Sequence, residues 1–206
     1  MCIRDRFSTV PNQEKTDLLW EMSGTFKLTD SPQAFRSCPR DCPADVQPKT
    51  CFVTNNPKIN YKSLNVRAFS GTEIADFEIF ENPANSFVFS EGYYLNVFQQ
   101  SLSALAYNYW STVDKLVNRD GTIFEAPSGK ISTNIYSLTT PENETFGFFF
   151  ATERAPIRGY IPPSFAGFPR TVCPVLPSPD GSGPGNCCNC LCELNSTTVQ
   201  PEWWVE

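Results

Sequence analysis

Hydrophobic and polar residues alternate along much of this chain with the two-residue period of a half-buried β-strand. The clearest case lies at residues 20–28, where Trp20, Met22, Phe26 and Leu28 alternate with polar neighbours. Shorter runs of this kind lie at residues 50–54, 64–69, 77–80, 87–89, 93–99, 122–124, 130–136, 144–152 and 157–161. They predict a mainly β domain, with an antiparallel sheet or a sandwich-like pair of sheets.

The period changes to that of a helix between residues 101 and 118. Apolar residues recur there in steps of three and four, at Leu102, Leu105, Ala106, Tyr109, Val113, Leu116 and Val117. Ser101 is a suitable N-cap, and Asp120-Gly121 a suitable stop. The pattern predicts one amphipathic helix that lies across the sheet and buries Leu102, Leu105, Tyr109, Val113 and Leu116.

The first six residues are set apart from the rest. They read Met1-Cys2-Ile3-Arg4-Asp5-Arg6, which resembles a translated sequencing adapter. We interpret residues 1–6 as a non-native leader. Residues 7–206 are then expected to form a single domain, truncated at its N-terminus, with a Pro/Gly/Cys-rich tail over residues 170–206.

Eight cysteines remain when Cys2 is set aside: Cys38, Cys42, Cys51, Cys173, Cys187, Cys188, Cys190 and Cys192. An even number in Pro- and Gly-rich loops predicts disulfides formed in an oxidising compartment. Three lie early and five late, so complete pairing requires at least one bond between the two groups. The alternative is a metal site, because Cys187 and Cys190 have a zinc-like spacing, but the chain has no His.

Charge and composition exclude several functions. The net charge of −6 disfavours nucleic-acid binding, and no apolar run is long enough to span a bilayer. Without His, a Ser-His-Asp or Cys-His arrangement is impossible within this chain. We find no catalytic, cofactor-binding or metal-binding motif, so we expect a non-enzyme without a cofactor.

Two groups of side chains could nevertheless carry function. Carboxylates cluster at Glu73, Asp76, Glu78 and Glu81. They could serve a carbohydrate-acting hydrolase, although a solvated strand face is the simpler interpretation. The aromatic residues Tyr107, Trp110, Trp203 and Trp204 could form a sugar platform or a partner-docking patch. For the two terminal tryptophans, packing of the tail onto its own domain is the favoured interpretation, because Trp is commonly buried.

Several segments, in order and spacing, carry a family resemblance. The run 93–102 (YYLNVFQQSL) leads into 106–110 (AYNYW), followed by 121–127 (GTIFEAP), 133–136 (TNIY) and 144–149 (ETFGFF). The late cysteines then run into 200–204 (QPEWW). Together these segments resemble the C-terminal half of the domain-of-unknown-function 4249 family (DUF4249), envelope lipoproteins of Bacteroidota. The crowded cysteine cluster departs from the usual family pattern.

The resemblance implies a function but no chemistry. Family members usually begin with a lipoprotein signal and an immunoglobulin-like β-sandwich, and their genes often lie beside those of outer-membrane TonB-dependent transporters. We therefore expect an outer-membrane-associated accessory module, periplasmic or surface-exposed, whose lipid anchor lies upstream. It would help a transporter to take up an unknown small ligand or glycan. A structural or adhesive surface protein is a further alternative.

Overall fold

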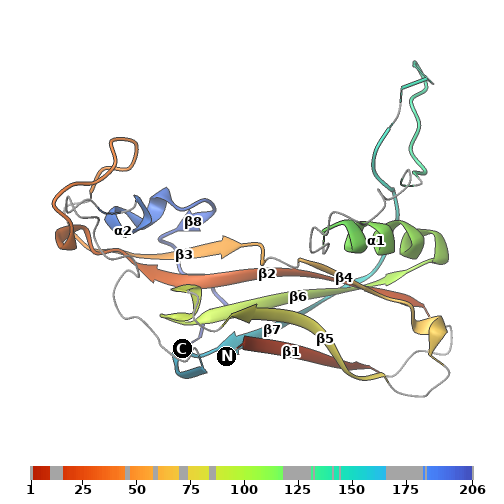
Figure 1. The fold of residues 1–206 in the computed structure, drawn as a ribbon, viewed down its shortest axis with the longest axis horizontal. Coiled ribbons are helices and arrows are strands. Elements are labelled where there is room, and N and C mark those ends of the chain that lie inside the picture. The colour runs from red at the N-terminus through yellow and green to blue at the C-terminus, as the bar shows by residue number, and fades with distance from the viewer. Residues whose placement is uncertain are drawn as a thin grey trace, which may run out of the picture.

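The computed structural model describes residues 2–9, 16–44, 47–57, 60–69, 74–83, 87–117, 131, 133–140, 142–143, 145–165, 183 and 185–205. The strands are β1 Cys2–Thr9, β2 Asp17–Thr29, β3 Thr50–Asn55, β4 Tyr61–Leu64, β5 Ile74–Pro83, β6 Tyr93–Leu102, β7 Arg154–Ile161 and β8 Ser196–Thr197. The helices are α1 Ala104–Val117 and the short α2 Gly185–Cys188. The prediction of a mainly β fold is confirmed (Figure 1).

Two antiparallel sheets make up the body. The larger has the order β7-β6-β2-β3-β8, with β4 also paired to β2. The smaller joins β1 to β5 and runs below the larger sheet in Figure 1. Cys2 to Arg6, the residues interpreted as a leader, pair within β1 with β5; this pairing does not test their origin.

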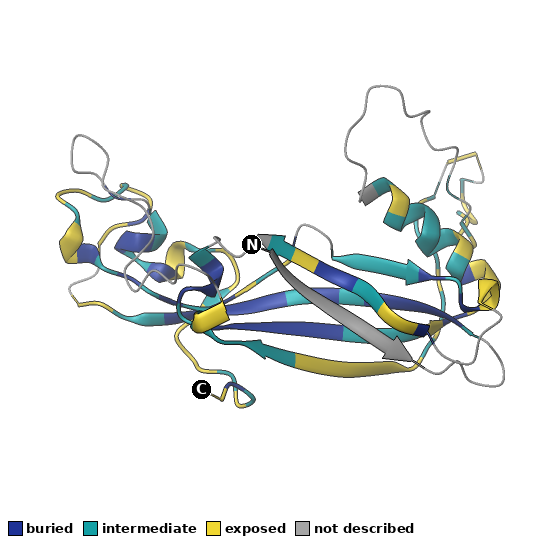
Figure 2. Ribbon diagram, turned by 60° about the horizontal axis from the view of Figure 1, so that its bottom comes forward, coloured by how far each residue is buried: buried dark blue, intermediate teal, exposed yellow. Residues whose placement is uncertain are grey.

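The inner face of the larger sheet holds the main core. Trp20, Met22 and Phe26 of β2 all lie on this face, as their alternation predicted. They pack with residues of β5 and β6 that include Ile79 and Leu95. Buried residues accordingly concentrate in the middle strands in Figure 2. Burial of these large side chains provides most of the driving force for folding.

The outer face of the same sheet is covered only at its two ends, as far as the described residues show. At one end, Leu19 and Leu102 pack with Ala106 of α1. At the other end, Phe52 and Tyr94 pack with Trp204 of the C-terminal tail. Figure 1 places α1 and the C-terminus at opposite ends of the sheet.

Several predicted strands take other forms. Residues 66–68 and 87–89 form 3-10 turns instead of strands. Residues 144–152 were also predicted as a strand, but the described residues 145–152 have no strand partner. The same holds for the described residues of the predicted run 130–136, whereas the run 122–124 lies outside the described residues.

The helix begins later than predicted. Ser101 and Leu102 belong to β6, and the hydroxyl of Ser103 accepts a hydrogen bond from the backbone N–H of Ala106 at 3.3 Å. The prediction that Leu105 is buried was wrong, because it is 72% exposed while Ala106 is fully buried. With Ala106 directed to the sheet, its neighbour Leu105 is rotated about 100° away around the helix axis.

Candidate functional site

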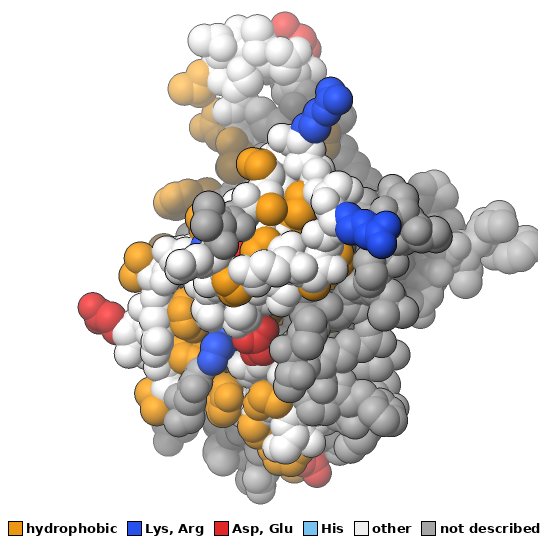
Figure 3. All heavy atoms as spheres, turned by 90° about the vertical axis from the view of Figure 1, so that its left-hand side faces the viewer, with side chains coloured by type: hydrophobic (Ala, Val, Ile, Leu, Met, Phe, Trp, Pro, Cys, Tyr) orange, Lys and Arg blue, Asp and Glu red, His pale blue; other side chains and the backbone are white. Residues whose placement is uncertain are grey.

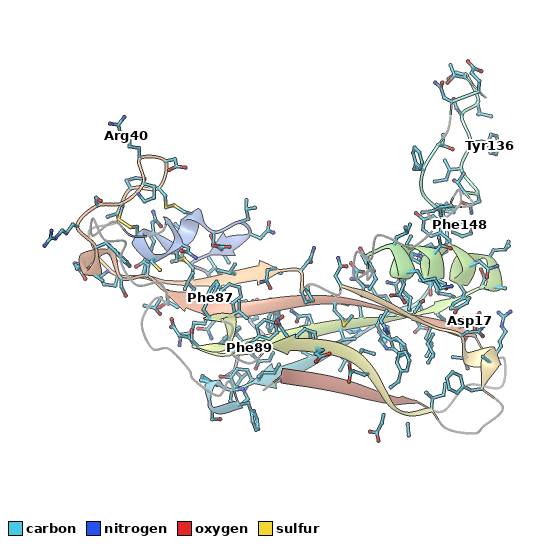
Figure 4. All side chains as sticks on the ribbon, in the orientation of Figure 1. Asp17, Arg40, Phe87, Phe89, Tyr136 and Phe148 are labelled. Carbon is cyan, nitrogen blue, oxygen red and sulfur yellow. A yellow bond between two sulfur atoms is a disulfide. The ribbon has the colours of Figure 1, made fainter. Side chains whose placement is uncertain are left out.

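A projecting arm is the most distinctive feature of the surface. It comprises the described residues 133–140, 142–143 and 145–152, between α1 and β7. In Figure 1 it rises well beyond α1, and Figure 4 shows the labelled Tyr136 high on it. We call this segment the aromatic arm.

Side chains hold the two sides of the arm together in place of a strand ladder. The amide nitrogen of Asn134 donates to the carbonyl of Phe149 at 2.7 Å, and its oxygen accepts from the Phe149 N–H at 2.7 Å. The Thr133 hydroxyl donates to the Gly147 carbonyl at 2.6 Å, and the Thr145 hydroxyl donates to the Ile135 carbonyl. Gly147 has a φ of +116°, which a residue with a Cβ rarely adopts.

The base of the arm is anchored on α1. Phe148 stacks on Tyr109 with ring centroids 5.3 Å apart, and Phe150 lies 6.1 Å from Trp110. Trp110 in turn contacts Tyr61 of β4 at 5.1 Å. The helix is tied to the same strand by Asp114, whose Oδ2 accepts hydrogen bonds from the N–H and hydroxyl of Ser63, both at 2.9 Å.

The upper part of the arm exposes large apolar side chains. Tyr136, Leu138, Phe146 and Phe149 are each at least 75% exposed. Five of its residues line an open hollow of about 460 Å³: Asn134, Ile135, Tyr136, Leu138 and Phe149. Figure 3, in which the arm rises at the top, shows hydrophobic side chains along one side of it. Such a grouping is typical of a protein interaction surface.

The predicted docking residues fall into two separate places. Tyr107 and Trp110 are half-buried at the base of the arm. The Nε1 atom of Trp110 is buried without a hydrogen-bond partner among the described residues. Trp203 and Trp204 lie on the outer face at the other end of the sheet. The four residues therefore do not form one patch.

Trp204 packs inside its own domain and is not available for docking. It is only 3% exposed and lies 5.0 Å from Phe52 and 4.9 Å from Tyr94, between ring centroids. The Tyr94 hydroxyl donates to the carbonyl of Val205 at 2.8 Å, which fixes the chain end. The terminal pair therefore packs onto its own domain, with Trp203 half-buried beside it.

Three disulfides join the early loop to the late one. They are Cys38–Cys188, Cys42–Cys192 and Cys51–Cys190. Cys187 is also disulfide-bonded, and Cys173 lies outside the described residues. The predicted disulfide-stapled tail is confirmed. We call this region, with α2 and the loop around residues 36–44, the disulfide clamp.

A buried carboxylate organises the clamp. Asp30 is fully buried, and its two oxygens accept hydrogen bonds from the backbone N–H groups of Lys49 at 2.8 Å and Cys190 at 3.1 Å. Backbone donors of this kind compensate the cost of burying the charge. The Asp30 side chain thus joins the early and late segments of the clamp by hydrogen bonds, in addition to the disulfides.

The acidic cluster does not converge on the hollow of the arm. Asp76 is exposed and has a φ of +55°, at an irregularity in the pairing of β5 with β1. Glu78 is half-buried, Glu81 is exposed, and Glu73 lies outside the described residues. Asp76, Glu78 and Glu81 all belong to β5, in the smaller sheet.

A second polar group lies on the uncovered part of the outer face. Arg154 forms an ion pair with Glu21 at 2.9 Å, close to Tyr61. Burial raises the pKa of the Tyr61 hydroxyl, the Glu21 carboxylate raises it further, and Arg154 lowers it. Tyr61 is therefore a neutral hydrogen-bonding group at physiological pH.

Sequence reasoning missed the aromatic arm as a site. Residues 146–150 are four Phe interrupted by Gly147. In a sheet with one buried and one solvent-exposed face, a strand alternates apolar and polar residues. In this run, aromatic residues would lie on both faces of a strand. That departure was the available signal, since Phe148 and Phe150 pack on the helix while Phe146 and Phe149 are exposed.

No helix in the described ranges is long and apolar enough to cross a membrane. Within the same ranges, no group of three or more His, Cys, Asp or Glu residues is placed to hold a metal ion. A family model described as "Domain of unknown function (DUF4249)" matches residues 5–158. No curated protein and no solved structure matches the chain.

Proposed function

This chain belongs to the DUF4249 family, and we propose that it is a non-catalytic binding module of the cell envelope that docks onto a partner protein through the aromatic arm. The observation that carries the proposal is the grouping of Tyr136, Leu138, Phe146 and Phe149, all largely exposed, on one projecting segment. Exposed apolar groups of this size are costly in water, so a partner that covers them gains free energy.

The composition of the arm supports a protein partner. The described residues 133–140 and 145–152 contain aromatic, aliphatic, Thr, Ser and Asn side chains but no charged one. The centres of protein interfaces are similarly rich in aromatic residues and poor in charge. Along the sequence, the nearest described charged residues are Glu142 and Glu153.

The geometry of the arm supports a preformed site. The paired hydrogen bonds of Asn134 with Phe149 fix the two sides of the hollow. The contacts of Phe148 with Tyr109 fix its base. A site held in place before binding loses less conformational entropy when the partner arrives. The hollow could receive one large apolar side chain of the partner, as interface anchors commonly do.

The proposed partner is an outer-membrane TonB-dependent transporter, with which the module would cooperate in taking up a small ligand or glycan. This choice follows from the gene neighbourhood typical of the family. Disulfide bonding of the clamp supports an oxidising compartment such as the periplasm or the cell surface. An upstream lipid anchor, as in related envelope lipoproteins, would hold the module at the outer membrane.

A pull-down from envelope extracts tests the proposal. The immobilised wild-type chain should capture the transporter encoded beside its gene. The double variant Tyr136→Ser with Phe149→Ser should capture much less, because each aromatic anchor contributes about 2 kcal/mol, or about thirtyfold in affinity. Both side chains are exposed, so thermal unfolding should be unchanged.

The matched control is Leu194→Ser with Val199→Ser, which removes two equally exposed apolar side chains (84% and 72%) beyond the clamp. It should leave capture unaffected. Equal capture by the arm variant and the wild type would contradict docking through the arm. Equal loss in both double variants would show nonspecific hydrophobic adhesion instead.

A further inference from the structure

The middle of the outer face carries two arginines that are held in fixed positions. Arg154 and Arg158 lie on one face of β7, opposite Gln100 and Asn96 of β6. Figure 2 shows much of β7, at the lower edge of the larger sheet, as exposed. We propose that this surface binds a saccharide that bears carboxylate groups. We call it the arginine strip and define it by Glu21, Asn96, Phe98, Arg154, Arg158 and Trp203.

Arg154 is fixed by two contacts. Its guanidinium carbon lies 3.7 Å from the centroid of the Phe98 ring, and one terminal nitrogen lies 2.9 Å from Oε2 of Glu21. The ring face attracts the cation and the carboxylate pairs with one of its nitrogens, so the two contacts together hold the guanidinium in place. Its remaining N–H groups are available at a side chain that is 48% exposed.

Arg158 is fixed in the same way at the other end of the strip. Its guanidinium carbon lies 4.9 Å from the centroid of Trp203, and its Nε donates to Oδ1 of Asn96 at 3.2 Å. Among the described residues, its terminal amino groups have no further acceptor, and the side chain is exposed. Two parallel N–H groups of this kind match the two oxygens of a carboxylate.

A buried hydrogen-bond chain orients Asn96 toward Arg158. Asn96 is only 5% exposed, and its amide nitrogen donates to the hydroxyl of Thr25 at 3.2 Å. That hydroxyl shares a further hydrogen bond of 3.1 Å with Thr54. The amide oxygen is therefore left to face the arginine. Hydrogen bonds of this kind to a buried side chain fix the position of the binding group that it contacts.

The charges of the strip select an acidic ligand. The whole chain has a net charge of −6, whereas the strip holds two arginines and one glutamate. The two arginines are four residues apart on one strand, which corresponds to about 13 Å. A ligand with acidic groups at intervals of this order could reach both.

The remaining groups favour a saccharide over an acidic peptide. Glu21 accepts hydrogen bonds from hydroxyl groups but repels carboxylates. Ser23 lies opposite Asn96 on the same face and adds a hydroxyl, while Tyr61, opposite Glu21, adds a neutral phenol. An acidic sugar chain presents carboxylates for the arginines and hydroxyls for Glu21, Ser23 and Tyr61. A run of acidic residues in a peptide presents carboxylates alone.

The edge of β7 is a poorer binding surface than its face. Pro156 lies between the two arginines in the strand and has no N–H to donate. Two arginines on an edge strand also oppose pairing with a second copy of itself. The ligand should therefore lie across the face of the strand and contact side chains. This inference does not depend on docking through the aromatic arm.

Titration calorimetry with tetragalacturonate tests the inference. The wild-type chain should bind it, and should bind neither maltotetraose, which lacks carboxylates, nor tetraglutamate, which lacks hydroxyls. Arg158→Gln should weaken binding by about tenfold, the usual loss for a charge-assisted pair. Arg158→Lys should restore little, because an ammonium cannot form the bidentate contact.

Arg40→Gln is the matched control, because it removes one exposed arginine on a loop of the clamp (Figure 4) that is not part of the strip. It should bind tetragalacturonate like the wild type, as should the arm variant Tyr136→Ser with Phe149→Ser. Absence of binding by the wild type would overturn the inference. So would binding of tetraglutamate with equal affinity, or an equal loss in Arg40→Gln, since either would indicate nonspecific attraction. Capture of the transporter should persist in Arg158→Gln, which separates this inference from the docking proposal.

Discussion

The two ends of the molecule are held by different forces. At the clamp end, three disulfides, the buried Asp30 and the buried Trp204 fix the late loop and the tail to the sheet. At the arm end, half-buried rings hold the arm to α1, and side-chain hydrogen bonds hold the two sides of the arm together. The difference indicates that global stability depends on the clamp end, while the arm end is free to present apolar groups.

The largest effect is expected from removing a disulfide of the clamp. Cys51 and Cys190 are both fully buried and 139 residues apart in sequence. Replacing both with Ala should lower the free energy of unfolding by about 4–5 kcal/mol. Because Cys42–Cys192 still joins the same two segments, the freed loop, through residues 42–51 and 190–192, has only about 13 residues and accounts for about 3 kcal/mol. The cavity left by the two buried sulfur atoms accounts for the rest. Urea unfolding followed by tryptophan fluorescence measures the change. A loss below about 1 kcal/mol would show that the clamp end is not the more stable one.

Trp204→Ala should have the next largest effect. The ring is 3% exposed and packs between Phe52 and Tyr94, so its removal leaves a cavity worth about 3–5 kcal/mol. Trp204→Phe should cost clearly less, since the lost Nε1 has no hydrogen-bond partner among the described residues. Thermal unfolding of both variants would decide. A Trp204→Ala variant as stable as the wild type would show that the ring is not part of the core and is free to contact a partner.

A smaller effect is expected where α1 joins the sheet. Asp114→Ala removes the acceptor of two hydrogen bonds from Ser63 and should cost about 1–3 kcal/mol. Lys115→Ala, one residue further and exposed, is the control and should change stability little. Hydrogen exchange should show faster opening of α1 in the first variant alone. Equal exchange in both would mean that aromatic packing, not this carboxylate, attaches the helix.

The smallest effect is expected at Leu105. This side chain is 72% exposed, so Leu105→Asp should change the free energy of unfolding by no more than about 0.5 kcal/mol. Ala106→Asp, at the fully buried neighbour, should unfold the domain because it places a charge in the core. Circular dichroism melts of the pair would test the orientation of α1. Unfolding by Leu105→Asp would show that the helix is rotated.

Much of the fold could be predicted from residue patterns because those patterns are local. The alternation of Trp20, Met22, Phe26 and Leu28 indicated one buried face, and β2 buries that face. The three- and four-residue steps after Leu102 indicated a helix, and α1 is there. The odd numbers of early and late cysteines required a bond between the groups if all were paired, and three such bonds form.

Spacing along the chain was therefore enough to predict a mainly β fold, the helix and the use of cysteines in disulfides. Three features depend on long-range packing instead: which cysteines pair, the exposure of Leu105 beside the buried Ala106, and the burial of Trp204. Long-range packing also decided that Phe146 and Phe149 stand free on an arm instead of joining a strand. Burial depends on contacts with segments distant in sequence, such as β4, β6 and the tail. The local pattern of apolar residues does not specify these contacts.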